Sequence, residues 1–187
     1  FDEYMKGRLV VDEQRKFLQS LLGHVKCADS FCARTETFET VADLERKIDG
    51  LSKDFPEFAS EIDLVRRCAP EISQVLRGDT NASELLFADS RWDETVEFYD
   101  KSFSFQKYNR IAKEAIAGII KNLPKGRGLR ILEIGAGTGG LTRWLLPILP
   151  PKRTEYFFTD LSPVFLERAK ATFEEDYNFI QYRIFDA

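Results

Sequence analysis

The feature that most constrains this chain is the stretch from Leu129 to Pro150, LRILEIGAGTGGLTRWLLPILP. It begins with a short apolar run that has the length and β-branched content of a buried parallel strand. Glycines follow at positions 135, 137, 139 and 140, and a helical pattern of apolar residues comes after them. A strand, a glycine turn and a helix in this order are typical of the first crossover of a doubly wound α/β sheet. Because glycine lets a ligand approach the backbone and a helix N-terminus offers free N–H groups, the stretch predicts a cofactor site.

A second strand-like run, Tyr156 to Thr159, ends at Asp160. Ser162 suits the N-cap of a helix and Pro163 suits its first position, so we expect a helix to begin here. Its expected apolar face is Val164, Phe165, Ala169 and Phe173. An acid at the carboxyl end of the second strand can accept hydrogen bonds from both hydroxyls of a ribose, which makes Asp160 a candidate ligand for a nucleoside.

The glycine turn alone does not identify the cofactor. GAGTGG satisfies the pattern GxGxxG, and Asp160 lies twenty residues after Gly140, near the spacing of dinucleotide sites. Glu133, two residues before Gly135, favours a different ligand. A carboxylate at this position would face the phosphates that the glycine turn of a dinucleotide site attracts, whereas it suits a ligand with a cationic group. A nicotinamide-dependent oxidoreductase stays the weaker alternative.

Composition places the chain among soluble globular proteins. Its 187 residues suffice for one domain with a core, or slightly more. The net charge of −4 argues against a nucleic-acid partner, and no apolar run reaches the ~18 residues of a membrane span. Three cysteines without paired CxxC spacing predict reduced thiols in the cytoplasm and no metal site. Phe1 is not an initiator residue, so we expect the chain to be part of a longer polypeptide.

Residues 1–124 are predicted to be mostly helical, and residues 125–187 to alternate strands with helices, ending in a third strand at Gln181–Phe185. Expected helices span residues 14–22, 40–48 (closed by Asp49-Gly50), a short segment from Pro70 to Gly78, residues 93–99 and residues 104–122. The Gly126/Gly128 linker marks the expected domain boundary. The first strand should be central in a sheet of this kind, yet nothing in the chain can pair with its other edge. We therefore expect the chain alone to be inactive and poorly behaved.

Several stretches together resemble the C-methyltransferase domain of polyketide synthases and hybrid megasynthases, a class I S-adenosylmethionine-dependent methyltransferase. They are ELLF (84–87), FYDKSFSFQKYNR (98–110), the glycine stretch, RTEYFFTDLSP (153–163) and FIQYRIFDA (179–187). The resemblance covers residues 35–187. It implies a helical lid at residues 1–124 and, at residues 125–187, the first three strands of a Rossmann-like core that binds S-adenosylmethionine.

The resemblance also implies an activity and a set of site residues. The methyl group would go to the α-carbon of a β-ketoacyl thioester held on the phosphopantetheine of an acyl carrier protein, beside neighbouring megasynthase domains of secondary metabolism. Glu133 and the turn residues Gly135, Ala136, Gly137 and Gly139 would hold the methionine part of the cofactor. The adenosine part would be held by Asp160 at the ribose, by Leu161 and Asp186 at the adenine, and by Tyr108 of the lid helix.

The resemblance places the catalytic base, a histidine paired with a glutamate, after a fourth strand and so beyond Ala187. The only histidine in this chain is His24, beside a glycine that ends an early helix, and we expect it to be solvated or to cap that helix. The catalytic residues are therefore unknown. An alternative interpretation is a degenerate methyltransferase-like domain that serves as a scaffold or adaptor in a megasynthase.

Overall fold

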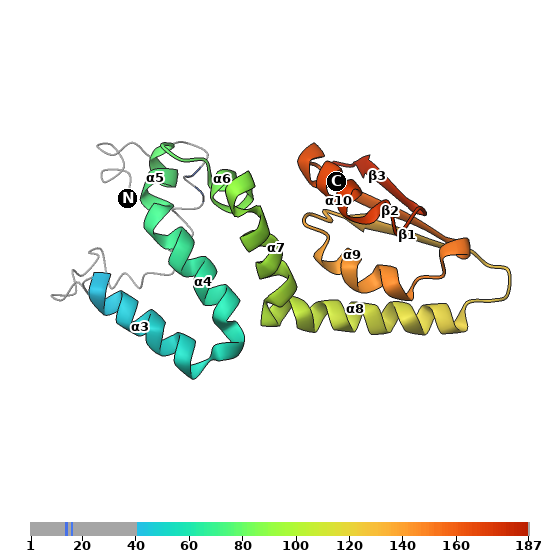
Figure 1. Ribbon diagram of the computed structural model, residues 1–187, viewed down its shortest axis with the longest axis horizontal. Helices are drawn as coiled ribbons and strands as arrows, with labels where there is room; N and C mark the ends of the chain where they lie inside the picture. The colour runs from blue at the N-terminus through green and yellow to red at the C-terminus, as the bar shows by residue number, and fades with distance from the viewer. Residues whose placement is uncertain (1–13, 15, 17–40, 187) are drawn as a thin grey trace. The chain divides into compact units, whose positions relative to one another are not determined.

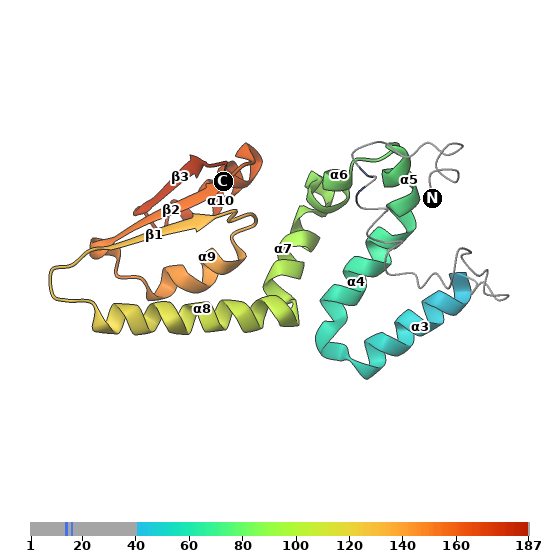
Figure 2. The ribbon, with the colours of Figure 1, turned by 180° about the vertical axis from the view of Figure 1, so that it is seen from behind.

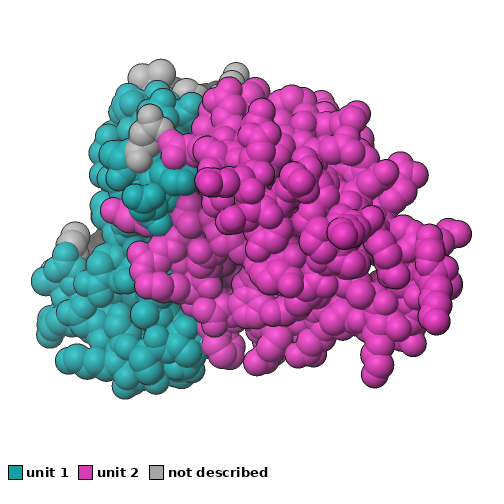
Figure 3. Space-filling view, turned by 45° about the vertical axis from the view of Figure 1, so that its right-hand side comes forward, with its two compact units in different colours: residues 1–93 teal, residues 94–187 magenta. Residues whose placement is uncertain are grey.

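The structure, a computed structural model, describes residue 14, residue 16 and residues 41–186. It divides into two compact units, residues 1–93 and residues 94–187 (Figures 1 to 3). The expected division into a helical lid at residues 1–124 and a partial cofactor-binding core at residues 125–187 stays a proposal. The helix expected at 14–22 lies outside the described residues apart from Gln14 and Lys16, as do His24, Cys27 and Cys32.

The first unit is helical wherever it is described. Its helices and short 3-10 turns are α3 (Val41–Asp54), η2 (Pro56–Phe58), α4 (Ala59–Cys68), η3 (Ala69–Glu71), α5 (Ile72–Arg77), α6 (Ala82–Phe87) and η4 (Asp89–Arg91). As predicted, α5 ends at Gly78, which takes the left-handed conformation with φ +78°. The expected end of a helix at Asp49-Gly50 is wrong, because α3 continues through Gly50 to Asp54. One glycine costs a helix only about 1 kcal/mol, and packing of α3 on α4, with an Asp49–Arg66 ion pair of 2.8 Å, offsets it.

Two helices lead into the sheet: α7 (Trp92–Lys101) and α8 (Phe103–Asn122). The second begins where predicted to within one residue, and the Ser102 hydroxyl at its N-cap accepts from the Phe105 N–H at 3.5 Å. The sequence of α8 predicts one long amphipathic stripe that includes Tyr108, Ile111, Ile116, Ile119 and Ile120, but in the structure these side chains lie on two faces. Ile116 and Ile120 pack against the core, whereas Tyr108, Ile111 and Ile119 are at least half exposed. Figures 1 and 2 show α8 beside α9 (Gly140–Leu145), which it contacts.

Three parallel strands form the sheet of the second unit in the order β1 (Leu129–Ile134), β2 (Thr154–Asp160) and β3 (Ile180–Ile184). Helix α9, with the turns η5 (Leu146–Ile148) and η6 (Pro151–Arg153), connects β1 to β2, and α10 (Pro163–Phe173) connects β2 to β3. Both connections run in the same direction across the sheet, from β1 to β2 and from β2 to β3. Since crossovers between parallel strands are right-handed, α9 and α10 lie on the same face. Because all three strands are parallel, their carboxyl ends meet at one edge.

The core lies on the face that α8, α9 and α10 cover. Tyr156 and Phe158 of β2 are fully buried there, together with Leu145 and Phe173 from the helices. Each such side chain contributes about 1.5–3 kcal/mol through the area that it buries. Of the apolar positions expected on α10, Ala169 and Phe173 are buried, but Val164 is 50% exposed, and Leu166 packs on the core in its place.

The opposite face of the sheet carries Leu132 and Ile134, which are 54% and 55% exposed. As expected from the sequence, β1 is an edge strand of the described sheet and pairs only with β2. None of the helices in the described ranges has both the length and the apolar character needed to cross a bilayer.

Candidate functional site

The glycine turn follows β1 directly and is held by its own backbone. Gly135, Gly137 and Gly139 have φ angles of +65°, +56° and +76°, a region that side chains other than that of glycine rarely adopt. The Gly139 N–H donates to the Ala136 carbonyl at 2.9 Å, and the Ala136 N–H donates to the Thr159 carbonyl of β2 at 2.9 Å. The turn is thus fastened across the carboxyl ends of both strands, where doubly wound sheets bind ligands.

Asp160 braces this turn from the end of β2. Its Oδ2 accepts from the Gly137 N–H at 2.9 Å, and its Oδ1 accepts from the Ser162 N–H at 2.9 Å. The residue is only 8% exposed. Ser162 occupies the N-cap of α10 as predicted, but its side chain makes no capping hydrogen bond. The Asp160 carboxylate therefore fixes the glycine turn and the start of α10, in addition to the ligand role proposed for it.

We expect Asp160→Ala to lower both stability and cofactor affinity. Two partly buried N–H groups would lose their acceptor, at a cost of up to about 1–3 kcal/mol for each group left unsatisfied. Asp160→Asn keeps one acceptor oxygen and should lie between the alanine variant and the wild type. Urea unfolding and calorimetric titration with S-adenosylhomocysteine would measure the two effects. Wild-type stability in the alanine variant would mean that these hydrogen bonds do not brace the turn.

Glu133 is held from two sides by hydroxyl groups. The Thr142 hydroxyl of α9 and the Tyr156 hydroxyl of β2 each donate to its Oε2 at 2.6 Å. Burial raises the pKa of the Glu133 carboxyl above its usual value, and the two hydrogen bonds oppose that rise. The other oxygen, Oε1, receives no hydrogen bond from the described residues. It is also not fully buried. It is therefore available to an additional donor.

The remaining predicted residues, Leu161, Asp186 and Tyr108, are all exposed. Leu161, directly after β2, is 64% exposed and offers an apolar surface beside Asp160. Asp186 is exposed two residues after β3 ends, and the preceding Phe185 N–H donates to the Asp160 carbonyl at 3.1 Å. Tyr108 on α8 is 67% exposed, and its hydroxyl forms no hydrogen bond with the part of the chain that the structure describes.

Two further residues belong to this candidate site, Thr142 and Tyr156, although no sequence motif marks them. For Tyr156 the signal is the alternation of side chains between the two faces of a strand, which places it on the same face as Glu133. Glu133 pairs with Phe158, and Ile131 pairs with Tyr156, so all four side chains lie on the helix-covered face of the sheet. Thr142 is the third residue of α9, but only the structure brings its hydroxyl within reach of the carboxylate.

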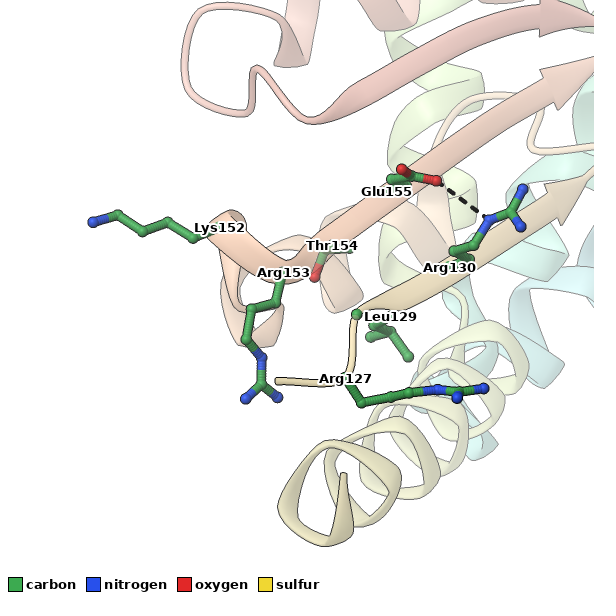
Figure 4. A pocket seen from close by; sticks show the side chains of 8 residues that line it. Arg127, Leu129, Arg130, Lys152, Arg153, Thr154 and Glu155 are labelled. Carbon is green, nitrogen blue, oxygen red and sulfur yellow. Dashed lines mark ion pairs between the residues drawn. The ribbon is translucent and has the colours of Figure 1, made fainter. Parts of the chain in front are cut away.

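A hollow of about 570 Å³ lies at the opposite end of the strands (Figure 4). It is lined by Arg127, Gly128, Leu129, Arg130, Lys152, Arg153, Thr154 and Glu155. Arg130 pairs with Glu155 at 3.2 Å, and the figure shows the long basic side chains diverging rather than converging on one point. Because ligands of doubly wound sheets bind at the carboxyl edge, this hollow is separate from the candidate cofactor site.

Comparison with known proteins gives a consistent answer. Residues 132–186 match the model of a methyltransferase domain family. The chain is 32% identical over 193 residues to the non-reducing polyketide synthase pkiA of Emericella nidulans, and 28% identical over 183 residues to 3-methylorcinaldehyde synthase tropA of Talaromyces stipitatus. These alignments cover 98% and 95% of the chain but 7% of each relative.

Solved structures show the same likeness. The CurJ carbon methyltransferase superposes with a TM-score of 0.83 at 31% identity, over 95% of this chain and 48% of that one. The CMeT domain of the citrinin polyketide synthase superposes with a TM-score of 0.80 at 26% identity, over 95% of this chain and 49% of that one. The chain thus spans about half the length of these solved domains. By sequence and by fold, the chain belongs to the methyltransferase family represented by the C-methyltransferase domains of polyketide synthases.

Proposed function

We propose that this chain holds S-adenosylmethionine at the carboxyl edge of its sheet. The observation that carries the proposal is the carboxylate of Glu133, held beside the glycine turn with one oxygen unused. A carboxylate in that place repels the phosphates of a dinucleotide and attracts an ammonium or sulfonium group. The Glu133 position therefore favours a cationic cofactor over NAD, although the turn satisfies the patterns of both.

Each part of the cofactor has a proposed partner. Glu133 and the turn residues Gly135, Ala136, Gly137 and Gly139 face the methionine part, Asp160 the ribose, and Leu161 and Asp186 the adenine. Tyr108 is proposed to reach the cofactor from the lid at residues 1–124. The cofactor supplies a methyl group on a positively charged sulfur, which is already a good leaving group. The tasks of these residues are to bind, to orient and to exclude water.

The proposed reaction is C-methylation at the α-carbon of a β-ketoacyl thioester carried by an acyl carrier protein, in the cytoplasm and beside other megasynthase domains. This step needs a base for the α-proton. His24, the only histidine of the chain, lies outside the described residues, and we do not assign it this role. The relatives that the chain matches are long polyketide synthases, which supports neighbouring domains as partners.

Calorimetric titration of the complete protein tests the cofactor. We expect S-adenosylmethionine and S-adenosylhomocysteine to bind, and NAD and NADH not to bind. Glu133→Gln should weaken S-adenosylhomocysteine about ten- to hundred-fold, because a charge-assisted hydrogen bond is lost. Binding of NADH alone would overturn the assignment. Binding of S-adenosylmethionine without methyl transfer to any acyl-carrier thioester would instead favour the scaffold interpretation.

A further inference from the structure

Two fully buried hydroxyl groups are aimed at one atom of the site. Thr142 and Tyr156 have exposed fractions of 0%, and both donate to Oε2 of Glu133 at 2.6 Å. They come from different elements, α9 and β2, and Glu133 comes from β1. The carboxylate is therefore gripped at the point where three elements around the glycine turn meet. We refer to Glu133, Thr142 and Tyr156 as the hydroxyl clamp.

The clamp is a costly way to join a helix to a sheet. On the same face of β1, Leu129 and Ile131 pack as apolar side chains against the core. An apolar residue at position 133 would continue this pattern, whereas a carboxylate must leave water. Two hydroxyl donors offset that cost only in part, because the pKa of Glu133 still lies above its usual value. Fastening α9 to the sheet does not by itself require an ionisable group.

We propose that Thr142 and Tyr156 are positioning residues for the cofactor: by holding Oε2 of Glu133, they fix the carboxylate so that Oε1 meets a cationic group of the ligand. This inference rests on the proposed function and assigns a role to two residues outside the predicted ligand set. Neither hydroxyl needs to touch the ligand. Both act through Glu133, by fixing its rotamer and by stabilising its charged form.

The clamp predicts how binding depends on pH. In the unliganded protein, burial raises the pKa of Glu133. The contribution of the Glu133 carboxyl to folding stability is therefore fully present below its unfolded-state pKa, and it is lost as pH rises through its folded-state pKa. A cationic ligand needs the charged form. Affinity should therefore fall as pH decreases through the raised pKa. Removing either hydroxyl removes a hydrogen bond that lowers this pKa, so the fall should move to higher pH.

The chain offers a matched control for the tyrosine. Tyr182 of β3 lies on the same face of the sheet, and its hydroxyl is buried without a hydrogen-bond partner among the described residues. Tyr182→Phe thus removes a hydroxyl of the same kind that does not touch Glu133. Thr142→Ser keeps the donor that Thr142→Val deletes, and it serves as the rescue variant for α9.

The experiment is calorimetric titration of the complete protein with S-adenosylhomocysteine from pH 5 to 8. We expect Tyr156→Phe and Thr142→Val to weaken binding at neutral pH about three- to thirty-fold, and to shift the midpoint of the pH dependence upward. Tyr182→Phe and Thr142→Ser should match the wild type in affinity and in the midpoint of the pH dependence. Glu133→Gln should remove this midpoint.

The outcomes separate the two proposals. If the wild type fails to bind S-adenosylhomocysteine, the proposed function fails. If the wild type binds but Tyr156→Phe and Thr142→Val keep its affinity and pH midpoint, the clamp only fastens α9 to the sheet, and this inference is overturned. Variants that lose thermal stability but bind with an unchanged midpoint would overturn it equally.

Discussion

Gly139→Ala is expected to lower the free energy of unfolding by about 2–5 kcal/mol. The residue has φ +76°, which costs an L side chain about 1–2 kcal/mol. A Cβ atom there would also lie 2.9 Å from Cε2 and 3.0 Å from Cζ of the Phe173 ring. Phe173 is only 6% exposed and packs within the core, so its ring cannot move away freely, and overpacking adds about 1–3 kcal/mol. Urea unfolding of the complete protein would measure the loss.

Gly118→Ala is the matched control for Gly139→Ala. Gly118 lies inside α8, where a Cβ atom would meet no atom of the described residues within 4 Å. Alanine is the better helix former by about 0.5–1 kcal/mol, so this variant should gain stability. The same chemical change is thus expected to have opposite signs at the two positions. Equal effects would show that contact with Phe173 does not determine the requirement for glycine at position 139.

Gly137→Val is expected to reduce affinity for S-adenosylhomocysteine by more than a hundred-fold. The residue has φ +56°, and a β-branched side chain is strongly disfavoured in that conformation. Among the described residues, a Cβ atom there would approach only the Gly135 carbonyl, at 3.9 Å, so the described part of the chain leaves the space beside the turn open. We propose that the cofactor fills that space. Valine would therefore occupy the ligand site and also disturb the N–H that donates to Asp160.

Gly126→Val separates backbone strain from ligand exclusion. Gly126 also has a positive φ, +80°, and no atom in the described part of the chain lies within 4 Å of its Cβ position. It precedes β1 and lies away from the glycine turn. We expect the Gly126→Val variant to be less stable than the wild type but to keep its affinity for S-adenosylhomocysteine. Normal binding by the Gly137→Val variant in the same titration would mean that the glycine turn is not the cofactor site.

The order of strands and helices could be predicted from local signals. Ser162-Pro163 correctly marked the start of α10, and Gly78 correctly marked the end of α5, because capping and helix-breaking act over a few residues. The end of α3 was missed, since its continuation through Gly50 depends on packing against α4. The division of the α8 stripe was missed for the same reason: periodicity shows which side chains share a face, but only the structure shows which face is covered.

The site was predictable in its positions but not in its hydrogen bonds. Glu133, the glycines and Asp160 follow from their places along the chain, because the carboxyl ends of parallel strands meet at one edge. That Asp160 braces Gly137 across 23 residues, or that Thr142 and Tyr156 share one oxygen of Glu133, depends on atomic distances that no sequence pattern encodes.

A crystal structure of the complete protein with S-adenosylhomocysteine would show whether the cofactor binds at the glycine turn. We expect ligand density across the carboxyl edge of β1, β2 and β3, with the ribose at Asp160 and the ammonium within hydrogen-bonding distance of Oε1 of Glu133. We also expect that Thr142 and Tyr156 still donate to Oε2. Ligand bound at another place, or an ammonium group turned away from Glu133, would contradict the proposed site.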